Sequence, residues 1–113
     1  MGKNVAVVIH EDPRKTHRPV EALRIALGLT AGTHRTTVVL LGDAVRLLTE
    51  DIDDIVDADI LEKYLPSIEQ LEVPFVLHTT TDRAAIRKEF STRYESDAGI
   101  RSLLQSMDRT LVF

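Results

Sequence analysis

The sequence has no cysteine, no tryptophan and few aromatic residues, which make up 4% of its 113 residues. Without cysteine there are no disulfides, no thiolate metal ligands and no cysteine-based catalysis in this chain. The scarcity of aromatic side chains indicates an aliphatic core and argues against a flavin-stacking site. None of the five glycines stands in a GxGxxG or GxxxxGK motif, which excludes nucleotide-binding loops of those types. We therefore expect no bound cofactor.

Long hydrophobic runs and an excess of basic residues are also missing. No apolar run approaches the ~20 residues that span a membrane, so no membrane partner is expected. The first apolar stretch is short and is followed by acids, which is not the pattern of a signal peptide. A cytoplasmic location is the default expectation. The net charge of -4 argues against nucleic acid, since phosphate binding needs a clustered basic face.

Charge is unevenly distributed along the chain. Residues 50–72 contain nine acids and one base, whereas residues 83–109 contain six bases and four acids. The simpler interpretation is a solvated acidic face. The alternative is a docking surface for a basic partner.

The pattern of apolar runs predicts one domain, residues 1–113, of the α/β class. Buried strands are expected where runs of valine, isoleucine and leucine occur, and a further short strand is possible near 92–94. Helical patterns separate these runs, and such alternation indicates a mostly parallel sheet of four to five strands with helices on both faces. The expected strands are Val5–Ile9, Thr36–Leu41, Val73–Leu77 and Thr110–Phe113.

Capping residues predict where the helices begin and end. Pro19 suits a first helical position, and that helix stops before Gly32. Pro66 is expected to break the next helix, which Asp57 or Asp59 caps. Thr81 or Asp82 is expected to cap a short helix through Phe90, and Ser96 another.

The helix from Pro19 to about Ala31 has an unusually wide apolar surface. Its polar positions are nearly confined to Glu21, Arg24 and Gly28. One sheet face does not bury so wide a surface, so a second helix or another subunit must cover the remainder. We therefore expect an oligomer.

Two predicted strands end in histidine, at His10 and His78. Ligands of open α/β sheets bind beyond the carboxyl ends of the strands, so this edge is the candidate ligand crevice. At His78 it continues with Thr79, Thr80 and Thr81, whose hydroxyl and backbone donors next to a helix start would suit an anion. Plain helix capping is the alternative for this stretch.

The loop after the first strand is the second part of the crevice. Glu11, Asp12 and His17 lie in it and, with His10 and His78, offer ligands for a divalent metal if adjacent strands bring them together. No compact metal motif such as HExxH is present, so a solvated loop is the favoured interpretation and no resident metal is expected.

A third part of the crevice is the Gly42, Asp43 pair. We interpret it structurally. Gly42 is expected to form a tight turn, and Asp43 is expected to cap a short helix from Ala44 to Leu48.

The order of these pieces resembles the DsrE/DsrF-like (TusBCD-like) family over nearly the whole chain. The resemblance is carried by VAVVIHEDP, EALRIALGL, VVLLGDAVRLL, LEKYLPSIEQLEV and PFVLH, of which GDAV is the most specific piece. It implies a flavodoxin-like three-layer sandwich and assembly into dimers, trimers or hexamers, some of them mixed.

The resemblance also implies where a sulfur-carrying cysteine would stand. Active members relay sulfur as a persulfide on a cysteine in the loop after the third main strand, which corresponds here to residues 78–82. Another branch carries it near the carboxyl terminus, at residues 111–113 here. Neither stretch has a thiol, and persulfide transfer needs one. The family reaction is therefore excluded for this chain.

Three hypotheses follow for the function. The first is a non-catalytic DsrE/F-like protein, an oligomeric accessory or binding subunit linked to sulfur-relay metabolism, with DsrE/F-like partners. The second is a small-molecule enzyme, or an anion- or metal-binding protein, that uses His10 and His78. The third is a purely structural homo-oligomer.

Overall fold

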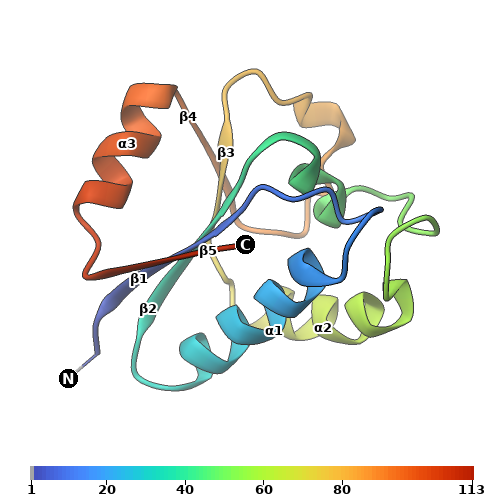
Figure 1. The fold of residues 1–113 in the computed structure, drawn as a ribbon, viewed down its shortest axis with the longest axis horizontal. Helices are drawn as coiled ribbons and strands as arrows, with labels where there is room; N and C mark the ends of the chain where they lie inside the picture. Colours follow the sequence, from blue (N-terminus) through green and yellow to red (C-terminus); the bar gives the residue numbers. More distant parts are fainter. Residues whose placement is uncertain (1) are drawn as a thin grey trace.

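The computed structural model describes residues 2–113 as a five-stranded sheet between helices (Figure 1). All strand pairs are parallel, and the strand order is β4-β3-β2-β1-β5. The four predicted strands and the short one near 92–94 are all present. The strands are β1 (Asn4–Ile9), β2 (Arg35–Leu40), β3 (Phe75–His78), β4 (Thr92–Glu95) and β5 (Arg109–Val112).

Helices lie on both faces of this sheet, which gives the three layers of a flavodoxin-like α/β fold (Figure 1). One face carries α1 (Arg18–Ala31) and α2 (Ala58–Gln70), which contact each other. The opposite face carries α3 (Asp97–Gln105). Two 3₁₀ helices, η1 (Gly42–Leu48) and η2 (Arg83–Ala85), complete the connections. Among residues 2–113, no helix has the length and apolar character needed to cross a bilayer.

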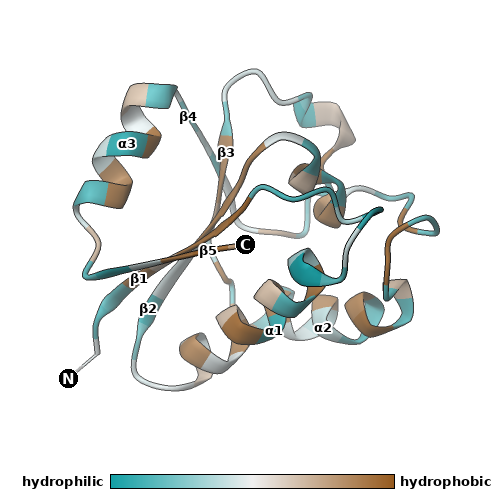
Figure 2. Ribbon diagram, viewed as in Figure 1, coloured by the Kyte–Doolittle hydropathy of each residue, from teal (hydrophilic) through white to brown (hydrophobic). Residues whose placement is uncertain are grey.

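The two faces of the sheet bury very different amounts of apolar surface. The main core lies between the sheet and the α1/α2 layer, where Ile9, Leu23, Leu61 and Phe75 are fully buried. The second core is small and consists of Val8, Val39 and Val76 under Ile100 of α3, with partly buried neighbours. Figure 2 shows this apolar lining where the helices face the sheet. The α3 side is thus the thinly covered side of the molecule.

The chain crosses from one face to the other after β4. From β1 to β4 each new strand is added at the same edge of the sheet. The buried residues of the connecting segments belong to the core on the α1/α2 face. The chain then returns across the opposite face through α3 to place β5 beside β1. The connections that leave β3 and β4 therefore run to opposite faces, and that switch point is where open sheets bind ligands.

Two local predictions are wrong. Pro66 does not break α2, which continues to Gln70, because the buried side chains Leu61, Leu65 and Ile68 anchor it on both sides of the proline. No helix runs from Thr81 to Phe90, where only the 3₁₀ turn η2 forms. Residues 86–90 instead place Ile86 and Phe90 in the main core.

The wide apolar surface of α1 is largely accounted for within the chain. Val20, Leu23 and Ala26 are buried against the sheet, and α2 packs beside the helix. Leu27 and Leu29 are partly buried against the same core. This helix therefore does not by itself require a second subunit.

Candidate functional site

His78 lies at the carboxyl end of β3, paired in register with Glu95 at the end of β4. Its ring is 28% exposed and is held from both sides. Nδ1 accepts a hydrogen bond from the Thr80 backbone N–H at 3.1 Å and lies 2.8 Å from Thr80 Oγ1. Nε2 lies 3.0 Å from Asp97 Oδ1, in the first turn of α3. Because Nδ1 accepts a backbone proton, the neutral ring carries its own proton on Nε2 and donates it to Asp97.

Ser96 and β3 together place this acid beside the histidine. Ser96 caps α3 by accepting a hydrogen bond from the Gly99 N–H at 3.1 Å, as its sequence position predicted. That cap fixes Asp97 at the start of the helix, directly beyond the end of β4. An acid, an imidazole and a hydroxyl, Asp97–His78–Thr80, thus line up at the switch point of the sheet.

The threonine stretch after His78 uses its backbone donors internally. Thr79 N–H donates to Glu95 O at 3.0 Å, Thr80 N–H to His78 Nδ1, and Thr81 N–H to His78 O at 3.0 Å. Asp82 accepts from the Ala84 N–H at 3.1 Å, so it caps η2. These donors are therefore already satisfied where the sequence suggested an anion site.

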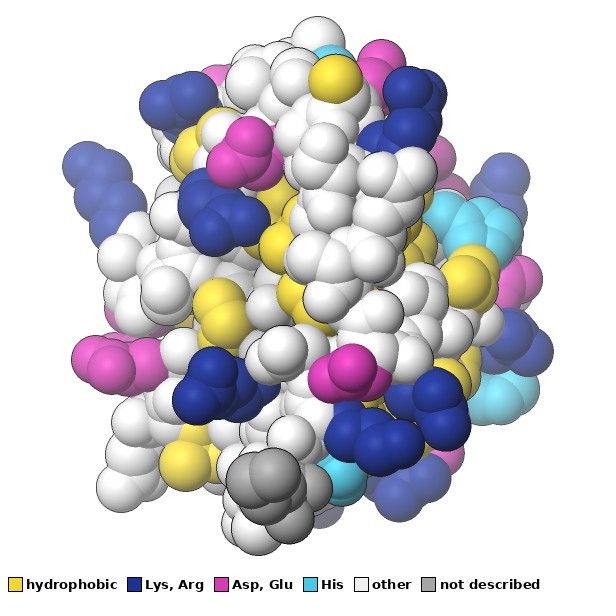
Figure 3. Space-filling view, turned by 90° about the vertical axis from the view of Figure 1, so that its left-hand side faces the viewer, with side chains coloured by type: hydrophobic (Ala, Val, Ile, Leu, Met, Phe, Trp, Pro, Cys, Tyr) yellow, Lys and Arg dark blue, Asp and Glu magenta, His cyan; other side chains and the backbone are white. Residues whose placement is uncertain are grey.

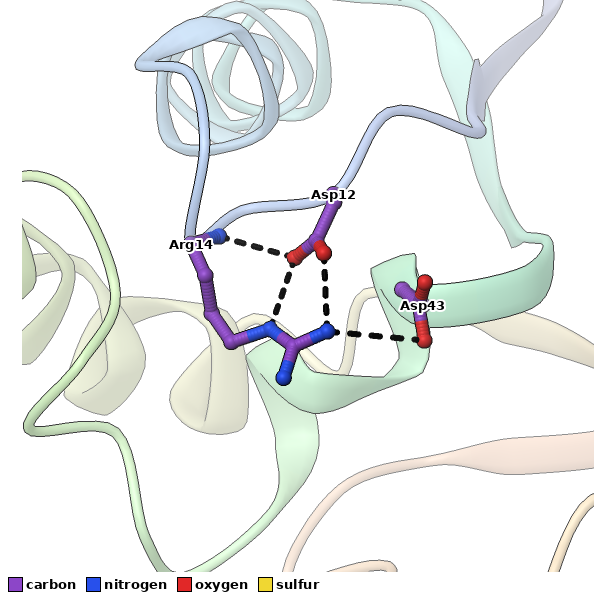
Figure 4. A network of polar contacts seen from close by, with 3 residues as sticks. All are labelled: Asp12, Arg14 and Asp43. Atoms are coloured by element: carbon purple, nitrogen blue, oxygen red, sulfur yellow. Dashed lines mark hydrogen bonds and ion pairs between the residues drawn. The ribbon is translucent and has the colours of Figure 1, made fainter.

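The loop after β1 is organised by Arg14 (Figure 4). Its guanidinium binds both oxygens of Asp12, with Nε 3.0 Å from Oδ1 and Nη2 2.8 Å from Oδ2, and its backbone N–H donates to Oδ1 at 2.9 Å. Nη2 also lies 3.9 Å from Asp43 Oδ1. Hydrogen bonds from the Arg14 side chain and backbone lower the pKa of Asp12 to about 2. The pair also raises the pKa of Arg14.

The other polar residues of this loop are also engaged or exposed. Glu11 Oε2 pairs with Arg18 Nε at 2.5 Å, and the Arg18 guanidinium lies 5.6 Å from the Phe113 ring centroid. His10 is exposed, and its backbone N–H donates to Phe113 O at 2.8 Å. His17 is exposed at the start of α1 and makes no side-chain capping bond. Arginine thus binds the carboxylates that the sequence offered to a metal.

The structure does not bring His10 and His78 together as adjacent strand ends. β2 lies between β1 and β3, so the two strands are about 10 Å apart. That expectation was wrong because the order of strands in a sheet is not encoded in any one strand. Throughout residues 2–113, no group of three or more histidine, aspartate or glutamate side chains is placed to hold a metal ion.

Gly42 and Asp43 lie between these two sites, after β2. Gly42 has a φ of +56°, a left-handed conformation that favours glycine, which agrees with the predicted tight turn. Asp43 is not the cap of the following helix, because η1 begins at Gly42 and its N-cap is Leu41. The Asp43 carboxylate faces Arg14 instead, so this turn and the first loop are joined.

Sequence reasoning missed Asp97 and Arg14 as members of these sites. Both signals were present, since Ser96 marked the start of α3 and Arg14 stands two residues after Asp12. Neither pairing follows from the sequence without the strand order or the loop conformation.

Comparison with known proteins places these features in a family. The family model described as DsrE/DsrF-like matches residues 3–81, which is more than half of the chain. The fold is similar to the crystal structure of the YchN protein from E. coli, with a TM-score of 0.76, 20% identity and 100% of both chains covered. No curated protein matches the chain significantly. The chain belongs to the DsrE/DsrF-like family.

Proposed function

We propose that this protein is a cytoplasmic, non-catalytic DsrE/F-like subunit that assembles with itself and with cysteine-bearing relatives in a sulfur relay. The observation that carries the proposal is the absence of any thiol from a chain that belongs to this family. Persulfide chemistry needs a sulfur nucleophile, and neither residues 78–82 (HTTTD) nor residues 111–113 (LVF) contain one. What such a chain contributes to a relay is binding and assembly.

Strand β5 offers the surface for that assembly. All four of its residues are exposed, with Leu111 at 37% and Val112 at 56%. Phe113, which follows it, exchanges hydrogen bonds with Val8 and His10, so by the alternation of a parallel ladder the backbone groups of Thr110 and Val112 point away from β1. Apart from the Val112 carbonyl, which accepts a hydrogen bond from Arg18 Nη2 at 3.5 Å, these groups have no hydrogen-bond partner within residues 2–113. An apolar edge with free backbone groups favours pairing with another chain.

The thinly covered face next to β5 extends this surface. Val112 pairs in register with Val8, which belongs to the small core under α3. Figure 3 views the molecule from the α3 side and shows hydrophobic side chains at the surface there, among charged ones. The opposite edge strand, β4, carries the Arg93–Glu95 ion pair at 3.2 Å, and charged edges resist pairing. β5 carries a single charged residue, Arg109, at its start, so its apolar end is the edge suited to a partner.

Native mass spectrometry of the tagged protein, purified from its own cells, tests the proposal. We expect a mixed assembly that contains at least one cysteine-bearing DsrE/F-like chain. A pure homo-oligomer would contradict the accessory role and leave only the oligomeric part. A monomer would contradict both parts.

The Asp97–His78–Thr80 alignment favours a second candidate function, hydrolysis or group transfer at Thr80. In that role the Nδ1 lone pair of His78 gives up the hydrogen bond from the Thr80 N–H and takes the proton of the Thr80 hydroxyl, while Asp97 stabilises the imidazolium. Hydrolysis of p-nitrophenyl acetate by the protein, by His78→Ala and Thr80→Val, and by His17→Ala as a control tests it. A rate equal to that of buffer, or one that the first two changes leave unaltered, excludes this candidate.

A further inference from the structure

A cavity of about 330 Å³ opens between α2, the chain that leads into it and the segment between η2 and β4. Its apolar floor is formed by the buried side chains Ile52, Leu65 and Phe90. Its acidic rim is formed by exposed carboxylates. No strand-end histidine lines it, so it is separate from the sites described above. The acidic rim consists of Glu50, Asp53, Glu62 and Glu69.

Helix α2 presents one continuous stripe to this cavity. Glu62, Leu65, Pro66 and Glu69 all line it, and their spacing of three, four and seven residues places them on one helical face. Pro66 has no N–H, so it cannot donate to the carbonyl of Glu62 four residues earlier. Pro66 therefore leaves the Glu62 carbonyl, which lies beside the cavity, without its usual helical hydrogen-bond donor.

The carboxylates of the acidic rim differ from a group of acids elsewhere in the protein that pair with arginine. Asp12, Glu11, Glu21, Glu89 and Glu95 each pair with an arginine. Within residues 2–113, no rim carboxylate forms an ion pair. Four like charges around one apolar floor repel one another, and a bound cation relieves that repulsion.

Arg87 lies in the wall of the cavity, next to its apolar floor. It is the basic residue of the lining, and its guanidinium lies 5.4 Å from the centroid of the Phe90 ring. Its Nη2 pairs with Glu89 at 2.6 Å rather than with the rim. A guanidinium stacked near an aromatic ring is thus already part of the wall, while the rim carboxylates stay available for a second one.

We propose that this cavity binds an arginine-bearing, partly apolar peptide segment of a protein partner. The arginine stem lies on the floor while its planar head pairs with the carboxylates of Glu62 and Glu69. The Glu62 carbonyl accepts a further hydrogen bond from the guanidinium. The size of the cavity suits one or two side chains, and the fork of arginine matches paired carboxylates better than a lysine or a polyamine does.

Fluorescence anisotropy with a labelled peptide of alternating leucine and arginine tests the proposal. Probes of the same length with lysine or glutamate in place of arginine, and free spermidine, serve as comparisons. We expect the arginine probe to bind most tightly, the lysine probe more weakly and the glutamate probe most weakly. Binding of the arginine probe should weaken as NaCl rises from about 50 to about 300 mM. We expect the double variant Glu62→Gln with Glu69→Gln to lower the affinity at least about tenfold.

The control removes two charges from the same helix region outside the cavity. Asp59→Asn with Glu72→Gln has the same net charge and should change the affinity by less than about twofold. Equal loss in both double variants, or no binding by the wild type, would overturn the proposal. If spermidine binds as tightly as the arginine peptide, the ligand of the cavity is a small polycation and the proposed peptide partner is wrong. If the Glu62→Gln, Glu69→Gln variant dissociates a homo-oligomer, the occupant of the cavity is a second copy of this chain and the proposed partner is wrong.

Discussion

Asp12 is the residue whose ionisation the fold controls most clearly. Arg14 lowers its folded pKa to about 2, below the ordinary value of 3.8 for an aspartate. The native state therefore favours the carboxylate, and the resulting stability is fully present above about pH 4. It is lost progressively as the pH falls through about 2.

We predict that Asp12→Asn has its largest destabilising effect above pH 4 and little effect near pH 2. Urea unfolding of the wild type and of Asp12→Asn across this range measures the difference. The two curves should converge toward low pH, because the wild-type carboxylate is then protonated in both states. Parallel curves would show that the Arg14 contact does not depend on the charge of Asp12.

Gly42 and Gly28 both have room for a Cβ but differ in backbone conformation, so they give a matched test of the turn. A Cβ at Gly42 or at Gly28 meets no atom within 4 Å, but Gly42 has a φ of +56° and Gly28 lies inside α1. We predict that Gly42→Ala lowers the free energy of unfolding by about 1 kcal/mol. Gly28→Ala should raise it by about 0.5–1 kcal/mol. Denaturant unfolding of both variants checks the signs, and equal signs would contradict the left-handed turn.

At the scale of elements, the sequence predicts what depends on local pattern. Continuous apolar runs predicted β1, β2 and β3 because a parallel sheet buries both faces of its central strands, and a similar run predicted the exposed edge strand β5. Ser96 predicted the start of α3 because a hydroxyl there satisfies a helix N–H. The failures occur where distant packing decides. Phe90 enters the core beside Phe75, with ring centroids 6.2 Å apart, and this holds residues 86–90 in an irregular path.

The candidate site was predicted only in part for the same reason. His78 was found because strand ends are marked by polar residues after an apolar run. Its partner Asp97 follows from the β4-β3 pairing, which no local pattern reveals. The same strand order separates His10 from His78.

Pro66 costs α2 one hydrogen bond that packing compensates. Its ring is exposed, whereas the side chains of Leu61, Leu65 and Ile68 are buried in the main core. We predict that Pro66→Ala raises the free energy of unfolding by about 1–3 kcal/mol, because it restores the bond to the Glu62 carbonyl. Thermal unfolding measures the gain, with the exposed neighbour Ser67→Ala as a control that should change little. A loss of stability in Pro66→Ala would mean that the ring itself packs.

At the scale of the whole molecule, the two sides of the sheet are unequal. The α1/α2 side closes a large core, whereas the α3 side is covered by one helix of nine residues and ends at the open edge of β5. The proposed cavity for an arginine-bearing segment lies beside α2, on the well-covered side. The proposed assembly surface and the proposed peptide site are therefore on different parts of the protein, and one change should not disturb both.

Val112 tests the assembly surface without disturbing the fold. Its side chain is 56% exposed, so a lysine there removes little buried area from the subunit. In an assembly paired through β5 the same lysine buries an unpaired charge, which costs several kcal/mol. We predict that Val112→Lys dissociates the assembly into smaller species, which native mass spectrometry measures. The denaturant midpoint for unfolding of the single subunit should not change. Gln70→Lys adds the same charge at the exposed end of α2 and should leave the mass unchanged. If both variants keep the wild-type mass, assembly through β5 is wrong, and the interface has to be sought on the face that α3 covers.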